Sequence, residues 1–149
     1  MNLDQEDFRK RVLFALEVPS NNFHPLVWVN GEPEVGENVF IGFFSEVNAK
    51  DSRIIIGKDC DIASFVTINC ADSHRKTIGL SPNISRKEIH IEESVFIGSH
   101  SVIEGGTRIG HNSVIAAGTI VDGVSIPPYS LVSGNPMTVK PGYYKAFQA

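Results

Sequence analysis

The chain has 149 residues, of which 42% are hydrophobic and 20% charged, and its formal net charge is −4. This length predicts a single domain, and the apolar share is enough for a buried core. The negative charge argues against nucleic acid as a partner, and no apolar run is long enough to insert into a membrane. The start of the chain is acidic and lacks the layout of a signal peptide, so we expect a cytoplasmic protein. The two cysteines, Cys60 and Cys70, make neither a disulfide framework nor a metal-ligand set.

The first predicted element is a helix over residues 2–17. Phe8, Val12 and Leu16 recur at intervals of four and form one apolar stripe. Asn2 or Asp4 can cap the start of this helix, and Pro19 stands just past its end. Because repeat folds need covered ends, we expect the helix to pack across one end of the repeats that follow it.

From residue 35 the chain carries a six-residue period of aliphatic residues. The period runs through three stretches, namely Val35, Ile41, Val47; Ile56, Ile62, Ile68; and Ile91, Ile97, Ile103, Ile109, Ile115, Val121. A small or β-branched residue stands four positions after each residue of the last stretch, from Val95 to Ser125. This period matches neither a helix nor a single strand and is typical of a β-helix with one short parallel strand per hexapeptide. Three hexapeptides make one triangular turn, so we expect about five coils, stacked to about 25 Å, with both sets of residues facing inward.

The period is interrupted in two places. Three extra residues precede the stretch that begins at Ile56, and 23 residues separate Ile68 from Ile91 where six are expected. The second interruption predicts one long loop, about 71–88, of a kind that is usually functional or disordered, although a tolerated surface insertion is the alternative. His74 stands where this loop leaves the coil. Pro127 and Pro128 are expected to end the β-helix of residues 35–126, and residues 127–149 to form a tail with a turn at Gly134–Pro136.

The segments VFIGSHSVIEGGTRIGHNSVIAAGTIV (95–121) and IPPYSLVSGNP (126–136) resemble the hexapeptide-repeat acyltransferases. Within that family they are most similar to the galactoside and maltose O-acetyltransferases and the xenobiotic acetyltransferases. The resemblance covers about residues 35–140 and implies an all-β fold, the left-handed parallel β-helix. It also implies a homotrimer that uses acetyl-CoA, with active sites between neighbouring subunits and the long loop reaching toward the adjacent one.

The resemblance also implies a catalytic residue. In the segment VTINCADSHRK, His74 falls, offset by one inserted residue, where the family has a histidine before its long loop. A neutral imidazole there would act as a general base that takes the proton of an acceptor hydroxyl as it attacks the thioester. Backbone N–H groups would then stabilise the tetrahedral oxyanion.

Coenzyme contacts follow from the same comparison. Ser99, beside Gly98, matches a family serine next to the pantetheine arm, and Ala117 matches an alanine whose main chain binds that arm. Small residues also suit the corners of a β-helix, so a purely structural role is the alternative. The two arginines that the family has near its C-terminus fall at Thr138 and Pro141 here, which leaves Lys140 and Lys145 for the coenzyme phosphates.

The acceptor is less well defined. Candidates to bind it are Asp51, Asn48, Asn69 and Asp72, of which the last two could equally cap a turn or orient the imidazole. The family's threonine and lysine after the sixth hexapeptide are replaced by Asp122 and Gly123. We therefore predict acetyl transfer to a hydroxyl of a sugar or sugar-containing acceptor, with N-acetylation of an amino sugar, nucleotide-linked or free, as the alternative.

Three other interpretations fit the sequence less well. A γ-class carbonic anhydrase would need three zinc-binding histidines, which the spacing of His90, His100 and His111 does not match, and no metal is expected. A non-catalytic β-helix used for assembly would have no base at the loop, so His74 argues against it. Cys70 as a covalent nucleophile is disfavoured because a buried cysteine is the commoner role.

Overall fold

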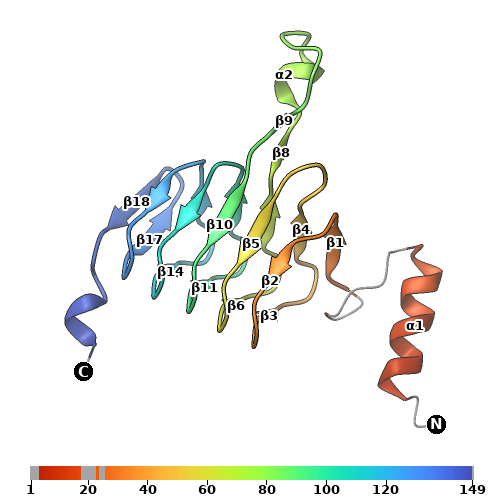
Figure 1. The fold of residues 1–149 in the computed structure, drawn as a ribbon, viewed down its shortest axis with the longest axis horizontal. Helices are drawn as coiled ribbons and strands as arrows, with labels where there is room; N and C mark the ends of the chain where they lie inside the picture. The colour runs from red at the N-terminus through yellow and green to blue at the C-terminus, as the bar shows by residue number, and fades with distance from the viewer. Residues whose placement is uncertain (1–3, 18–22, 24–25, 149) are drawn as a thin grey trace.

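The computed structural model describes residues 4–17, 23 and 26–148. Short strands wind into a prism of stacked coils, from which one loop projects (Figure 1). The first sheet has the order β1 (Trp28–Asn30), β4 (Glu46–Asn48), β7 (Thr67–Asn69), β12 (Val102–Glu104) and β15 (Ile120–Val121). The second has the order β2 (Glu34–Val35), β5 (Ile54–Ile56), β10 (Ile89–Ile91), β13 (Arg108–Ile109) and β16 (Ser125–Ile126). The third contains β3 (Phe40–Ile41), β6 (Asp61–Ile62), β11 (Phe96–Ile97), β14 (Val114–Ile115), β17 (Leu131–Gly134) and β18 (Met137–Lys140).

Each sheet takes one strand from every coil, and the neighbouring strands are parallel except at the β17–β18 hairpin. The predicted class, an all-β parallel β-helix of about five coils, is therefore confirmed, and the winding is consistent with the left-handed form.

Two corners of the prism matter for the site. The loop corner lies between the first and second sheets and contains residues 49–53, 70–88, 105–107 and 122–124. The return corner lies between the third and first sheets and contains residues 42–45, 63–66, 98–101 and 116–119.

The six-residue period builds the core. The aliphatic residues of the last stretch, from Ile91 to Val121, are all fully buried, as predicted. The small residues between them are buried too, and their hydroxyls bond to the backbone of another coil. Ser101 Oγ, for example, donates to the carbonyl of Ala116 at 3.1 Å. These hydrogen bonds let polar atoms occupy the interior without a desolvation penalty.

The end of the repeat differs from the prediction at two points. Ile126 follows Val121 by five residues, so the corner between β15 and β16 is one residue short and Ser125 faces outward instead of inward. Pro127 and Pro128 do not end the coils, because β17 pairs in parallel with β14 and buries Val132. The predicted turn at 134–136 is confirmed and leads into the antiparallel strand β18. A 3₁₀ helix at Lys145–Phe147 follows.

The N-terminal helix α1 (Gln5–Ala15) begins after Asp4, whose side chain accepts a hydrogen bond from the Glu6 N–H at 3.2 Å. Asp4 is thus one of the two predicted caps, while Asn2 and Pro19 lie outside the described residues. The predicted packing across the coils is not seen: α1 stands beside the first coil (Figure 1), with Phe8 45% and Leu16 53% exposed. Leu13, which is not part of the predicted stripe, is buried instead, at 7% exposed. None of the described helices is long and apolar enough to cross a membrane.

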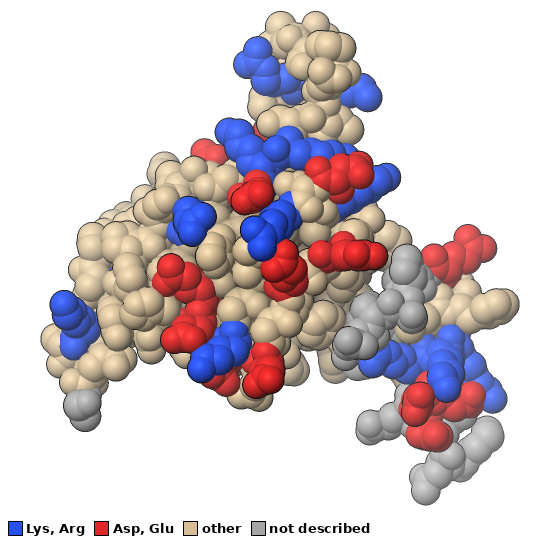
Figure 2. Space-filling model, viewed as in Figure 1, with Lys and Arg blue, Asp and Glu red and all other residues tan. Residues whose placement is uncertain are grey.

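The long loop at 71–88 is present and has a structure of its own, which the prediction lacked. Strands β8 (Ala71–Asp72) and β9 (Ser85–Arg86) pair antiparallel, and the short helix α2 (His74–Thr77) follows β8. The loop extends well beyond the coils, and Lys and Arg side chains gather at its foot (Figure 2). The chain thus leaves the prism as a ribbon that fixes where the loop begins.

Candidate functional site

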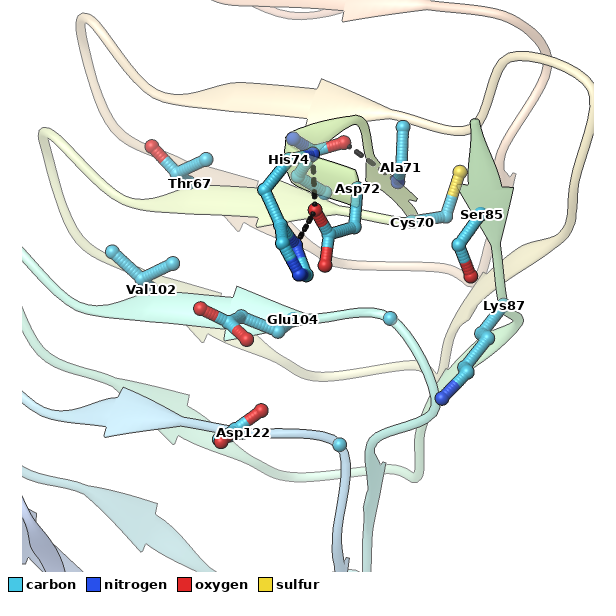
Figure 3. Close-up of a pocket in the computed structure, with 13 residues that line it drawn as sticks. Thr67, Cys70, Ala71, Asp72, His74, Ser85, Lys87, Val102, Glu104 and Asp122 are labelled. Carbon is cyan, nitrogen blue, oxygen red and sulfur yellow. Dashed lines mark hydrogen bonds and ion pairs between the residues drawn. The ribbon is translucent and has the colours of Figure 1, made fainter. Parts of the chain in front are cut away.

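A cavity of about 590 Å³ lies at the foot of the loop, on the loop corner. Its walls come from three sources that are distant in sequence: the loop, the carboxyl ends of first-sheet strands, and the corners that follow those strands. The lining residues with functional side chains are Asn69, Asp72, His74, Lys87, Glu104 and Asp122. Figure 3 shows His74 and Asp72 above the cavity, with Glu104 and Asp122 in successive coils below them.

His74 and Asp72 form a hydrogen-bonded pair. Asp72 ends β8, and its Oδ1 accepts from the main-chain N–H of His74 at 2.9 Å and lies 2.6 Å from His74 Nδ1. The main-chain N–H of His74, followed by the bond to its imidazole, holds the pKa of the Asp72 carboxyl below its ordinary value. Both side chains are more than half exposed, so solvent screens their charge attraction. The pair therefore acts by orientation: Nδ1 faces the carboxylate, and Nε2 is left for the cavity.

Glu104 and Asp122 form a second pair on the floor of the cavity. Glu104 ends β12 and Asp122 directly follows β15, and because Ile103 and Val121 before them are paired in register, the two residues lie side by side in successive coils. Partial burial, followed by a hydrogen bond to Asp122 and by its negative charge, raises the pKa of Glu104 above its ordinary value. The floor of the cavity thus carries two neighbouring acidic side chains, and the negative charge of Asp122 acts on Glu104.

The structure brings some of the predicted acceptor residues into the cavity and leaves others outside. Asn69 and Asp72 line it, and Asn69 also caps the turn that follows, because its Oδ1 accepts from Ala71 N at 2.9 Å. Asn48 is paired in register with Asn69 one coil away but does not line the cavity. Asp51 is exposed on the loop corner, in the left-handed conformation with φ 54°, and is also outside it.

The predicted coenzyme residues lie elsewhere on the prism. Ser99 and Ala117 stack in successive coils of the return corner, where Ser99 O accepts from Gly118 N at 2.9 Å. A Cβ on Gly98 would lie 2.5 Å from Ala117 N, so this glycine is needed for the close stacking of the coils. Lys140 lies on β18 with its Nζ 5.6 Å from the centre of the Tyr143 ring. None of these four residues lines the cavity that holds His74.

Sequence reasoning did not select Glu104, and it treated Asp122 only as a departure from the family. A signal was available, because Glu104 has the same phase in its coil as Asn69, with which it pairs in register. Cys70 contributes to the cavity wall but its side chain is buried. Among the described residues, no group of three or more His, Cys, Asp or Glu side chains is placed to hold a metal ion.

Comparison with known proteins agrees with the fold. Residues 88–123 match the family model of the bacterial transferase hexapeptide (six repeats). A galactoside O-acetyltransferase of Escherichia coli (strain K12) is 38% identical over 123 residues, covering 75% of this chain and 59% of the relative. A galactoside O-acetyltransferase of Lactococcus lactis is 31% identical over 133 residues, covering 72% of this chain and 61% of the relative. A galactoside acetyltransferase in complex with coenzyme A superposes with a TM-score of 0.59 at 27% identity, covering 97% of this chain and 84% of that one.

Residues 88–123 carry hexapeptide repeats of the bacterial transferase type, and the coils of the prism agree with that match. The chain is similar to galactoside O-acetyltransferases, as the two segments at 95–121 and 126–136 predict. The chain spans about three fifths of the length of these curated relatives, 61% and 59%.

Proposed function

We propose that this protein is an acetyltransferase that moves an acetyl group from acetyl-CoA to a hydroxyl or amino group of a sugar-like acceptor. The observation that carries this proposal is the His74–Asp72 pair, 2.6 Å apart at the edge of a cavity on a hexapeptide prism. Coenzyme A is bound in one structure of similar fold, and galactoside is the acceptor named for the curated relatives. Location in the cytoplasm stays a prediction from the sequence.

The chemistry follows from the orientation of the imidazole. Asp72 accepts a hydrogen bond from Nδ1–H, which keeps the proton on Nδ1 and leaves Nε2 unprotonated and able to take a proton from the acceptor. The acceptor oxygen or nitrogen then attacks the thioester carbon, and the carbon–sulfur bond breaks. The proton on Nε2 passes to the departing coenzyme thiolate, so the base is restored. A positioned base of this kind contributes about 10²–10⁴-fold to the rate.

A complete site needs a second chain. His74 lies on the loop corner, whereas Gly98, Ser99 and Ala117 lie on the return corner, at the other end of the first-sheet strands. A neighbouring copy that presents its return corner to this cavity would supply the coenzyme side of the site. This placement supports the homotrimer implied by the family resemblance, in which each active site lies between two subunits.

Release of free thiol from acetyl-CoA tests the proposal. The purified protein is screened against sugars, amino sugars and nucleotide-linked sugars, and His74→Ala is expected to lower kcat by about 10²-fold or more with an unchanged thermal transition. The control is His90→Ala, because His90 contacts Arg108 on the second sheet, away from the cavity. Near-wild-type turnover in His74→Ala would overturn the role of this residue. Absence of acetyl-CoA binding and of turnover with every acceptor would favour the non-catalytic assembly module.

A further inference from the structure

We infer that Glu104 and Asp122 make the acceptor site selective for an amine, so that the acetylated group is an ammonium in its resting form rather than a sugar hydroxyl. This inference rests on the proposed function, because it assigns the acceptor side of the same cavity. It concerns two residues that neither the family resemblance nor the sequence pattern selects.

Glu104 and Asp122 lie where an acceptor would bind. The site is defined by the cavity and by the His74–Asp72 pair, and the floor opposite that pair is formed by Glu104 and Asp122 (Figure 3). An acceptor within reach of the imidazole therefore lies between it and these two carboxyl groups. Any charge on the acceptor close to its reacting atom meets this floor directly.

The floor of the cavity carries an excess of acidic side chains. Carboxylates that lie side by side in successive coils repel each other. Within the described part of the chain, no Lys or Arg forms an ion pair with Glu104 or Asp122. The negative charges of Asp122 and Asp72 both act on Glu104. Lys87 is the cationic side chain of the cavity wall, so acidic groups outnumber it three to one there.

An ammonium group fits this floor better than a hydroxyl does. It offers three N–H donors and a positive charge to two carboxyl groups, and hydrogen bonds between charged groups are stronger than neutral ones. A hydroxyl offers one donor and leaves the negative charge of the floor uncompensated. The family's threonine and lysine at the positions of Asp122 and Gly123 would present no such floor, so this chain differs at the point that contacts the acceptor.

The proton balance of the reaction is complete with the groups present. The ammonium nitrogen gives its first proton to a carboxylate of the floor, from which it passes to water, because Glu104 and Asp122 are both exposed. The free amine forms a bond to the thioester carbon as the carbon–sulfur bond breaks. His74 Nε2 takes the second proton and delivers it to the coenzyme thiolate. The products are an amide, free coenzyme thiol and one proton released to solvent.

Matched acceptors test this inference. Glucosamine is compared with glucose, and galactosamine with galactose, by thiol release from acetyl-CoA at one pH. We expect kcat/KM to favour each amine by about tenfold or more, and Glu104→Gln/Asp122→Asn to reduce this ratio by about tenfold through the KM of the amine. The control Glu37→Gln, which removes a carboxylate from the corner between the second and third sheets, should keep the wild-type ratio.

The outcomes distinguish failure of the amine preference from failure of the proposed acetyltransferase activity. If hydroxyl sugars are acetylated as well as or better than amines, or if the double variant keeps the amine preference, the inference is wrong and the acetyltransferase stands. If none of the four sugars is acetylated, binding is measured by the melting temperature instead. A melting temperature that rises with glucosamine but not with glucose in the wild type, and does not rise in the double variant, supports the inference. A wild type whose melting temperature does not rise with glucosamine overturns it. If the protein also fails to bind acetyl-CoA, the proposed function itself fails.

Discussion

His74 owes its orientation to a connection of one residue between β8 and α2. Asp72 closes β8, Ser73 follows, and the chain then turns into α2, so that the carboxylate of Asp72 meets both the main-chain N–H and the Nδ1 of His74. Sequence spacing placed His74 at the loop, but it could not distinguish whether Asp72 binds the acceptor or the imidazole. The structure shows the contact to the imidazole, because the turn between them is tight.

Asp72→Asn tests this positioning role. An amide can turn its NH₂ group toward Nδ1 and so favour the wrong tautomer, which would leave Nε2 protonated. We expect kcat to fall by about tenfold, less than the ~10²–10⁴-fold loss of the whole base, while the KM for acetyl-CoA stays the same. Asp72→Glu should recover part of the activity. A fall in kcat that is accompanied by a lower melting temperature would indicate a structural role instead.

Glu104 gives a prediction on pH and stability. Its pKa in the folded chain is raised above the value of 4.5 that applies to an unperturbed glutamate. Between these two values the folded state binds more protons than the unfolded state, so stability falls as the pH rises through this window and stays lower above it. Glu104→Gln removes the effect, so the variant should melt higher than the wild type at pH 7.5 but not at pH 4. A difference in melting temperature that is the same at both pH values would contradict this cause.

The sequence alone does not predict that Glu104 and Asp122 are neighbours. Glu104 and Asp122 are 18 residues apart, and what joins them is the register between β12 and β15. The hexapeptide period fixes which residues face inward, and these are the residues that the sequence identified correctly. Outward neighbours depend on the length of each corner, which the period of the buried residues leaves undefined.

Within each short strand, successive side chains point to opposite faces, so a buried residue alternates with a more exposed one. Ile115 of β14 is fully buried in the prism, whereas its neighbour Val114 faces outward and is half-buried. We expect Ile115→Ala to lower the free energy of unfolding by about 2–5 kcal/mol, because it leaves a cavity between stacked coils. Val114→Ala is the matched control and should cost about 1 kcal/mol or less. Urea denaturation measures both, and equal losses would contradict the inward stacking of the six-residue period.

The corners are the elements that sequence reasoning described least well. The period carried through from Ile91 to Val121, but the next corner is one residue shorter, which turned Ser125 outward. The two prolines after it were expected to stop the coils, yet they occupy a corner where proline is acceptable, and β17 follows in parallel. Proline removes a backbone donor from a strand but not from a turn, so its position relative to the corner decides its effect.

At the scale of the whole molecule, the predicted trimer would cover apolar surface that a single chain leaves exposed. The loop stands clear of its own coils (Figure 1) and carries Ile78 and Leu80, which are 64% and 62% exposed. The return corner exposes Phe44 and Phe65, whose rings stack with centroids 5.2 Å apart. Contiguous apolar surface of this kind is typical of an interface between protein chains.

Light scattering tests the assembly, since a trimer of 16.3 kDa chains has a mass of 3 × 16.3, or 48.9 kDa. We expect Ile78→Asp/Leu80→Asp to shift the mass toward the monomer, because a subunit interface would bury the added carboxylates without partners. The matched control is Phe147→Asp, at an exposed residue near the C-terminal end of the chain. The shift should abolish acetyl transfer while His74 and Asp72 remain in place, because the cavity would lose the neighbour's Ser99 and Ala117. A monomeric variant with full activity would show that one chain holds the whole site.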